Sequence, residues 1–341
     1  GWPGVGEDPH PDESLRLIWA FERAKRATSA GEVAELIRTY GLPREAVPTT
    51  YLKEVSVWEA LLAANMPLTA LIRNLATMTR IGLLTPGSEA TRVVAAQLTA
   101  EKRLKSARVH PIALLSALKT YVGGRGERGN GTWTPVGAIT DALNTAFYKS
   151  FRNVEPTNKR WLLALDVSGS MDGGMIAGAP GLSPRVASAA MAMVTAATEN
   201  DYRMVAFTAS GGGMGGRWGS GESGLTPLSL TPAQRLDDVV KAVSSLPMGG
   251  TDCALPMLWA LKNRVEVDAF VVYTDSETWH GSIHPSQALR EYRDRMGIAA
   301  KLIVVGMVAN EFTIADPNDA GMLDVVGFDT ASPQLIADFA R

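Results

Sequence analysis

Two hydrophobic patterns divide the chain near residue 155. Before that point, apolar residues recur at helical spacing in segments of similar length, as in "DESLRLIWAFERAKRA" at 12–27. The segment at 29–41 begins at a potential N-cap, Ser29, and ends at Gly41. Further helices are expected at 53–82, in two parts separated before Pro67, and at 88–107, 110–124 and 134–151. This succession of similar helices on short loops favours stacked helical hairpins of the solenoid type.

Beyond residue 155, apolar strands alternate with helical segments. Strands are expected at 161–166, 203–208, 268–274 and 301–306. Helices are expected at 183–200, 231–246, 254–263 and 285–297, and the pattern ends in the tail "PQLIADFAR". Continuous apolar strands alternating with helices are typical of a mostly parallel sheet covered on both faces. The two patterns predict an all-α domain of helical repeats at 1–155 and an α/β, Rossmann-like domain at 156–341.

The first expected strand ends in three oxygen-bearing side chains, in the stretch "WLLALDVSGSMDGG". Asp166, Ser168 and Ser170 form the pattern D-x-S-x-S. Parallel sheets bind ligands at the carboxyl ends of their strands, where Asp166 lies. One carboxylate and two hydroxyls make a partial oxygen cage that suits Mg²⁺ or Mn²⁺ and does not suit zinc. Alone, this pattern is often only a turn or a helix cap.

Two distant segments offer the further oxygens that a divalent cation needs. "MGGTDCALPM" places Thr251 and Asp252 before a helix, and "FVVYTDSETW" places Asp275 at the end of another apolar strand. Each segment could also be a plain helix start or loop cap. If the three segments meet at one edge of the sheet, they predict a divalent cation site, with Mg²⁺ as the expected ion.

Composition excludes several classes of protein. The chain is 46% hydrophobic and 20% charged, which is typical of soluble globular proteins. Its apolar runs are far shorter than the roughly 20 residues that cross a bilayer, and its first residues lack a signal-peptide pattern. We therefore expect a cytoplasmic protein that binds no membrane. The single cysteine, Cys253, excludes an internal disulfide and a multi-cysteine metal site.

Charge is divided unevenly between the two predicted domains. Residues 1–160 carry 21 Lys and Arg against 15 Asp and Glu, whereas residues 161–341 carry 12 against 20. The basic part favours a polyanion such as RNA, and the acidic part can hold a cation. Candidate phosphate contacts are Arg73 and Arg80, seven residues apart on one helix face, and the cluster Lys102, Arg103, Lys105, Arg108 and His110. The alternative is that these side chains bridge neighbouring helices or face solvent.

Three aromatic residues of the helical part are candidates for stacking on bases: Trp58, Tyr121 and Trp133. Aromatic side chains in helical repeats more often belong to the core. His280 and His284 are four residues apart, but Gly281 and Pro285 break a helix there, so we expect no shared metal-ligand face. No Ser-His-Asp or Cys-His arrangement can be assembled, and we expect no enzyme.

The three oxygen-bearing motifs, "DVSGSM", "GGTD" and "YTDSETW", resemble the metal-ion-dependent adhesion site of a von Willebrand factor A domain. In that family the D-x-S-x-S residues and the threonine ligate Mg²⁺, and the later aspartate acts mainly through water. The resemblance therefore implies that Asp166, Ser168, Ser170 and Thr251 are ligands of the ion. It also implies that Asp275 acts mainly through water.

The helical segments extend the resemblance over nearly the whole chain. "MPLTALIRNLATMTRIGLL", "ARVHPIALLSALKTYVGG" and "AFYKSFRNVEPTNKRWLLALDVSGSM" closely resemble the Ro autoantigen and bacterial Ro-related family, in which a TROVE module of HEAT-like repeats precedes a von Willebrand factor A domain. The resemblance implies binding of Y-type noncoding RNA and of misfolded RNA ends in RNA quality control. In bacteria it also implies tethering to a 3′ exoribonuclease.

The chain departs from that family in two ways. Family members carry more helical repeats, so we expect a fragment or a shortened homologue. The glycine-rich insert "SGGGMGGRWGSGESG" at 210–224 is expected to form a mobile loop near the metal edge.

Two functions from different classes follow from these features. The first is a non-catalytic RNA-binding scaffold of a small ribonucleoprotein, whose A domain holds a divalent cation that can take a carboxylate from an acidic protein ligand. The second is a metal-dependent protein-adhesion module with the helical repeats as a stalk. A Mg²⁺-dependent hydrolase is disfavoured, because phosphatase-type sites need an acid where Ser168 stands.

Overall fold

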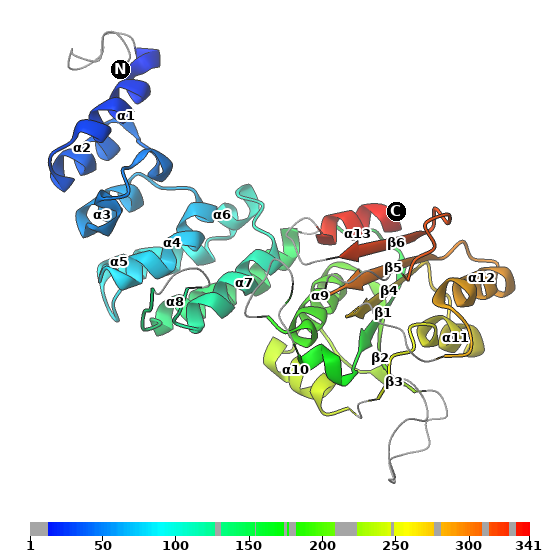
Figure 1. Ribbon diagram of the computed structural model, residues 1–341. Helices are drawn as coiled ribbons and strands as arrows, with labels where there is room; N and C mark the ends of the chain where they lie inside the picture. Colours follow the sequence, from blue (N-terminus) through cyan, green and yellow to red (C-terminus); the bar gives the residue numbers. More distant parts are fainter. Residues whose placement is uncertain are drawn as a thin grey trace. The chain divides into compact units, whose positions relative to one another are not determined.

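The computed structural model describes residues 13–126, 131–153, 155–173, 176, 182–208, 224–246, 249–275, 281–308, 314–326 and 332–341. The chain folds into two compact units (Figure 1). The first contains Gly1–Val109 and Ala117–Lys149, and the second contains His110–Ser116 and Ser150–Arg341. Almost all of the predicted loop at 210–224, and His280, lie outside the described residues.

The first unit is helical, as predicted. Its helices are α1 (Arg16–Arg26), α2 (Ala30–Tyr40), α3 (Val55–Ala63), α4 (Leu68–Arg80), α5 (Glu89–Thr99), α6 (Glu101–Ser106), α7 (Pro111–Val122), which contributes residues to both units, and α8 (Gly137–Lys149). Short 3-10 turns lie at Glu13–Leu15, Arg44–Ala46 and Tyr51–Lys53. The helices pack on one another, with α2 against its neighbour α3, and α5 against α8, from which two helices separate it in the sequence.

Local chemistry sets the helix ends. The Ser29 hydroxyl accepts the Glu32 N–H at 3.2 Å, and Gly41 ends α2 with a positive φ of 66°. The prediction of a single helix at 88–107 is wrong. The segment forms two helices, α5 and α6, which are divided at Ala100, whose backbone is extended. There the Thr99 carbonyl accepts a hydrogen bond from Lys149 Nζ at 3.0 Å, a side-chain donor at the point where the helix ends.

The second unit is built on a six-stranded sheet in the order β3-β2-β1-β4-β5-β6. The strands are β1 (Arg160–Asp166), β2 (Asp201–Phe207), β3 (Leu225–Leu228), β4 (Ala269–Thr274), β5 (Lys301–Gly306) and β6 (Met322–Val326). All neighbours are parallel except β3, which runs antiparallel to β2. The predicted mostly parallel sheet is therefore confirmed.

The two edge strands were not predicted from the sequence. β3 reads "LTPL" and β6 reads "MLDVV", and both are partly exposed. Edge strands pair with a neighbour on one side only, and they tolerate proline and charged residues. Pro227 and Asp324 therefore occur within these strands, and they interrupt the continuous apolar run by which a central strand is recognised.

Helices cover both faces of the sheet, as predicted (Figure 1). They are α9 (Pro184–Thr198), α10 (Leu236–Ser244), α11 (Leu255–Lys262), α12 (Pro285–Met296) and α13 (Ser332–Ala340), with 3-10 turns at Gly169–Asp172 and Ser150–Asn153. α11 and α12 share a core with the face of the sheet that includes Leu162 and Phe270. α9 packs on β1 and β4 from the opposite face.

An ion pair joins the starts of the two central strands. Arg160, at the start of β1, donates from Nε and Nη2 to the two carboxylate oxygens of Asp268, at 2.9 and 2.6 Å. These hydrogen bonds lower the pKa of Asp268 below its usual value. A carboxyl with a lowered pKa contributes stability above its unfolded-state pKa and loses that contribution as the pH falls through its folded-state pKa.

Replacing Asp268 by Asn is expected to cost about 1 kcal/mol at pH 7, because the pair is partly exposed and solvent screens it. For a unit of this size, the melting temperature would fall by about 2–4 °C. Thermal unfolding followed by circular dichroism measures the difference, which should shrink below about pH 4 as the wild-type carboxyl protonates. A difference that stays constant down to pH 3 would contradict the assignment.

Candidate metal centre

Asp166 is the buried centre of the site. It is the last residue of β1, and only 1% of its surface is exposed. Oδ1 accepts the Ser168 N–H and Oδ2 accepts the Thr274 hydroxyl, both at 2.8 Å. Because β1 and β4 are parallel neighbours with Leu165 opposite Tyr273, the ends of these strands bring Asp166 beside Thr274 and Asp275. Thr274 was not among the residues predicted for the site. Its signal in the sequence is a hydroxyl directly before the strand-end Asp275.

Burial leaves the Asp166 carboxylate poorly stabilised as an anion. Burial raises the pKa of Asp166 to about 6, against the hydrogen bonds from Ser168 and Thr274, and the charge of Asp275 adds to the rise. Asp275 is itself only 7% exposed. Two buried carboxylates that repel each other are the arrangement that a divalent cation neutralises, so these residues fit the expected ion.

The two serines of the motif converge. Ser168 is buried and Ser170 is exposed, in the 3-10 turn at Gly169–Asp172, and their hydroxyl oxygens lie 3.1 Å apart. A turn that brings two hydroxyls together directly after a strand-end carboxylate provides a compact set of hard oxygen donors.

Thr251 and Asp252 lie in the loop before α11, and both are buried. The Thr208 hydroxyl, just past β2, donates to the Gly250 carbonyl at 2.9 Å and ties this loop to the end of β2. Since Asp166 pairs with Phe207, the loop belongs to the same edge of the sheet. Asp252 Oδ1 accepts the Ala254 N–H at 3.0 Å, which gives this residue a role at the start of α11.

Gly281 packs directly on Asp252. Its φ is +120°, and a Cβ at this position would lie 2.7 Å from Asp252 Oδ1. Gly281→Ala is therefore expected to strain the backbone, displace the Asp252 carboxylate and cost about 2 kcal/mol, or about 4–8 °C in melting temperature. Thermal unfolding measures the loss. Gly173→Ala is the control, because its φ is negative and its Cβ would only reach an ordinary 3.5 Å contact with the Ser170 carbonyl. Equal losses in both variants would contradict the packing argument.

The other ligand types have structural roles where they are described. His284 Nδ1 accepts the Ser286 N–H and caps α12, and Cys253 is buried in the core beside the sheet. Over the described ranges, His, Cys, Asp and Glu side chains form no group of three or more that could hold a metal ion. The candidate site consists largely of Ser and Thr hydroxyls, so it is not a cluster of these four residue types.

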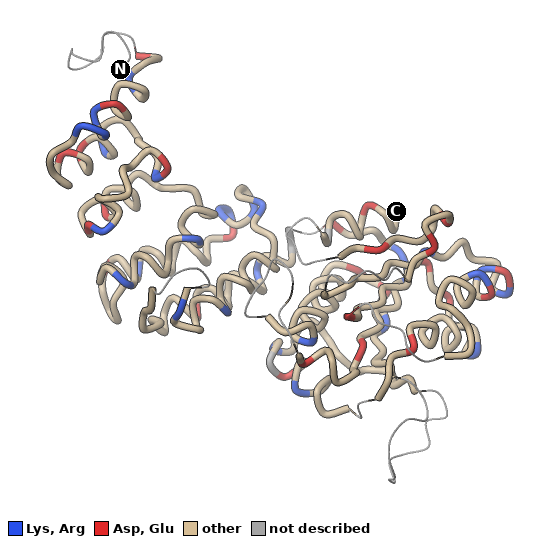
Figure 2. Tube along the Cα trace, in the orientation of Figure 1, with Lys and Arg blue, Asp and Glu red and all other residues tan. Residues whose placement is uncertain are grey.

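The candidate RNA contacts of the helical part differ in their surroundings. Arg73, Arg80, Lys102, Lys105 and Arg108 are exposed, and within the described ranges no ion pair involves them. The Arg80 guanidinium lies against Gly131, where a Cβ would come within 2.5 Å of Nη1. Other basic side chains of the same unit pair with glutamates: Arg16, Arg23, Lys25, Arg38, Arg92 and Lys149. Figure 2 shows the distribution of charge along the chain.

Arg103 and His110 serve the fold. Arg103 Nη2 donates to the Met66 carbonyl at 2.7 Å, and burial lowers the pKa of this arginine. His110 Nδ1 accepts the Ile112 N–H at 3.2 Å, just before α7. The structure therefore gives these two candidates local structural partners.

Two of the three aromatic candidates belong to the core, and Trp133 is only partly buried. Trp58 is fully buried and donates from Nε1 to the Leu52 carbonyl. Tyr121 is also buried, its hydroxyl lies 2.8 Å from the Thr79 hydroxyl, and its ring stacks with Trp133. Trp58 and Tyr121 are thus not available for stacking on bases.

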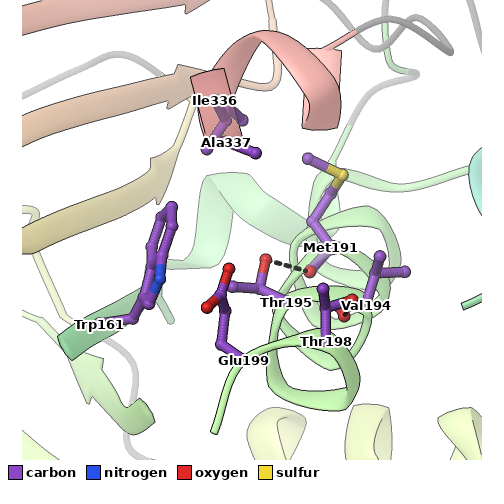
Figure 3. A pocket seen from close by; sticks show the side chains of 8 residues that line it. All are labelled: Trp161, Met191, Val194, Thr195, Thr198, Glu199, Ile336 and Ala337. Atoms are coloured by element: carbon purple, nitrogen blue, oxygen red, sulfur yellow. Dashed lines mark hydrogen bonds between the residues drawn. The ribbon is translucent and has the colours of Figure 1, made fainter. Parts of the chain in front are cut away.

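A small pocket lies at the other end of β1 (Figure 3). Its lining residues are Trp161, Met191, Val194, Thr195, Thr198, Glu199, Ile336 and Ala337. Glu199 accepts the N–H groups of Thr157 and Asn158, at 2.7 and 3.0 Å, and thereby fixes the segment that leads into β1. Trp161 is the second residue of β1 and Asp166 is its last, so this pocket is separate from the candidate metal centre.

None of the described helices combines the length and the apolar character needed to cross a membrane.

Comparison with known proteins gives matches to both parts. Residues 12–120 match the TROVE domain, and residues 160–340 match the Ro60 vWA domain. The chain is 46% identical over 329 residues to the RNA-binding protein RO60 of Deinococcus radiodurans, covering 96% of this chain and 59% of that protein. The RNA-binding protein RO60 of Caenorhabditis elegans is 43% identical over 329 residues, covering 96% of this chain and 48% of that protein.

A solved structure is similar as well. The crystal structure of the RO (RSR) protein from Deinococcus radiodurans has a TM-score of 0.87 and 45% sequence identity, and the match covers 98% of this chain and 65% of that chain. The present chain therefore spans only part of the length of the relatives that it matches.

Proposed function

Because this chain belongs to the Ro60 family, with a TROVE domain followed by a Ro60 vWA domain, we propose that it is a non-catalytic RNA-binding scaffold of a small ribonucleoprotein. The relatives from Deinococcus radiodurans and Caenorhabditis elegans are named RNA-binding proteins. The observation that carries the proposal is a set of exposed basic side chains on α4 and α6, Arg73, Arg80, Lys102 and Lys105, which no carboxylate neutralises within the described residues. Such charges are available for RNA phosphates.

The RNA partners that we propose are Y-type noncoding RNA and the single-stranded ends of misfolded RNA. The role is RNA quality control in the cytoplasm, with a 3′ exoribonuclease as a further partner. The resemblance of the helical segments supports these partners. Unpaired guanidinium groups support phosphate recognition, since Arg matches phosphate oxygens in bidentate geometry.

The vWA domain of the proposed scaffold holds a divalent cation, and Mg²⁺ is the proposed ion. Asp166, Ser168, Ser170 and Thr251 would bind it, and Asp275 would act mainly through water. When bound, the ion would neutralise the Asp166 and Asp275 carboxylates and could accept a carboxylate oxygen from an acidic protein ligand. The buried and mutually repelling carboxylates support this part of the proposal.

A mobility shift tests the RNA function. The chain is titrated into a structured RNA that bears a single-stranded 3′ end, with and without EDTA and at several salt concentrations. We expect binding that falls steeply with salt and does not respond to EDTA, because the basic residues lie outside the metal centre. Absence of binding at low salt would contradict the scaffold function.

The alternative function is a metal-dependent protein-adhesion module with the helical repeats as a stalk. The observation that favours it is the gathering of oxygen donors at the ends of β1, β2 and β4. This function predicts that an acidic peptide binds with Mg²⁺ and is released by EDTA, and that RNA affinity is weak.

A further inference from the structure

Arg185 is the one lysine or arginine that is buried in the described part of the chain, with 2% of its surface exposed. It lies in the first turn of α9, the next helix along the chain after the turn that contains the D-x-S-x-S motif. A guanidinium that loses its hydration needs hydrogen-bond acceptors in return. The position of those acceptors indicates what the side chain does.

Within the described residues, the acceptors of Arg185 belong to the turn that carries the two candidate serine ligands. Nε donates to Asp172 Oδ1, and Nη2 donates to Asp172 Oδ2 at 2.9 Å and to the Ser168 carbonyl at 3.2 Å. The guanidinium thus donates hydrogen bonds to both ends of the turn, at Ser168 and at Asp172. Ser170 lies between them and is exposed, so its position depends on the conformation of the turn.

Attraction between the Arg185 charge and the bound ion cannot be the reason for a buried guanidinium beside this site. A positive charge beside a cation site repels the ion, and here Asp172 compensates that charge within the pair. What remains is geometry: the planar guanidinium fixes two oxygens of one carboxylate and a carbonyl at once, which a lysine ammonium cannot do in the same arrangement.

We propose that Arg185 is a positioning residue of the metal centre, whose guanidinium holds the Ser168–Asp172 turn in the conformation that lets the Ser168 and Ser170 hydroxyls bind a divalent cation. The inference rests on the proposed function, in which the vWA domain holds such an ion. Arg185 itself acts through the turn and not as a ligand.

Mn²⁺ binding by the full chain tests the inference, with free Mn²⁺ measured by electron paramagnetic resonance. Arg185→Lys keeps the charge and loses the planar fork, so any change in affinity reports geometry. We expect Mn²⁺ affinity to fall about tenfold or more, the usual effect of losing a group that orients metal ligands. Asp172→Asn is the second variant, because Asp172 is 46% exposed and its replacement disturbs packing little. It should also weaken Mn²⁺ binding.

Arg293→Lys is the matched control. Arg293 also donates to a carbonyl and a carboxylate, Ala300 O at 2.7 Å and Asp319 Oδ2 at 2.5 Å, but neither belongs to a candidate ligand segment. Arg293→Lys should lower the melting temperature and leave Mn²⁺ affinity unchanged. If Arg185→Lys behaves in the same way, Arg185 is only a structural residue and the inference is wrong.

Hydrogen exchange separates failure of the inference from failure of the proposed metal centre. The Met171 and Gly173 amides donate to the Ser168 and Ser170 carbonyls within the turn. In the metal-free protein, Arg185→Lys should speed exchange at these two amides. Unchanged exchange overturns the positioning role, whatever the metal does. If wild-type protein binds no Mn²⁺ although exchange in the variant is faster, the metal centre fails and Arg185 positions only a turn.

Discussion

Without divalent cations, the Asp166→Asn variant is expected to unfold at a higher temperature than the wild type at pH 7.5, and Mg²⁺ is expected to stabilise only the wild type. The Asp166 carboxylate is almost fully buried and lies near a second buried carboxylate. Burying this charge lowers the free energy of unfolding. Replacing the carboxylate by a neutral amide removes this destabilisation, which is on the order of 1–3 kcal/mol. The same change removes the anionic ligand that a divalent cation requires.

The gain from Mg²⁺ in the wild type follows from linkage. A ligand present at 100 times its dissociation constant stabilises the folded state by about 2.7 kcal/mol. Thermal unfolding with EDTA and with a Mg²⁺ series measures both effects. Asp201→Asn is the control, because Asp201 is exposed at the opposite end of β2, and this variant should respond to Mg²⁺ like the wild type. A Mg²⁺ response that survives in Asp166→Asn would rule out the assigned centre.

RNA affinity should fall on the order of 100-fold when Arg73, Arg80, Lys102 and Lys105 are all replaced by Gln. Each phosphate contact that is lost reduces the salt dependence of binding, with a slope of about 0.7 per contact for single strands. Four contacts would therefore lower the slope of log affinity against log salt by about 3. Fluorescence anisotropy between 50 and 200 mM salt gives both quantities.

The control variant removes the same charge from ion-paired residues of the same unit. Arg23, Lys25, Arg38 and Arg92 each pair with a glutamate. Replacing these four by Gln should change RNA affinity much less, because their charges are already balanced. If both quadruple variants lose affinity equally, net charge and not the α4 and α6 side chains determines binding.

The sequence predicted those parts of the fold in which burial is continuous. The interiors of β1, β4 and β5 are continuously apolar because helices cover both faces, so their patterns were unambiguous. β3 and β6 are partly exposed at the edges and carry Pro227 and Asp324. At the division near Ala100, the Thr99 carbonyl accepts a hydrogen bond from Lys149, a residue far away in sequence that no local pattern brings to this point.

The candidate site divides in the same way. Asp166, Ser168 and Ser170 stand at alternate positions of one short stretch and could be grouped from their spacing. The ends of parallel strands predicted that they would meet Asp275. Arg185 was missed, because an arginine in the first turn of a helix usually faces solvent. Its signal is a lone charge among the small and apolar residues of "SPRVASAAMAM". Arg103 and His110 illustrate the reverse problem, since a basic run in the sequence cannot reveal that a carbonyl or an amide already binds the side chain.

The bond between the Thr274 hydroxyl and Asp166 joins residues that are 108 positions apart in the sequence. Closing so long a segment is entropically costly and slow, and it must precede the gathering of the oxygen donors. On a ribosome, the first strand and its serine turn emerge long before their partner strand. The proposed cation would therefore bind only after β1 and β4 have paired. Its binding would follow the assembly of the centre of the sheet and would not nucleate the domain.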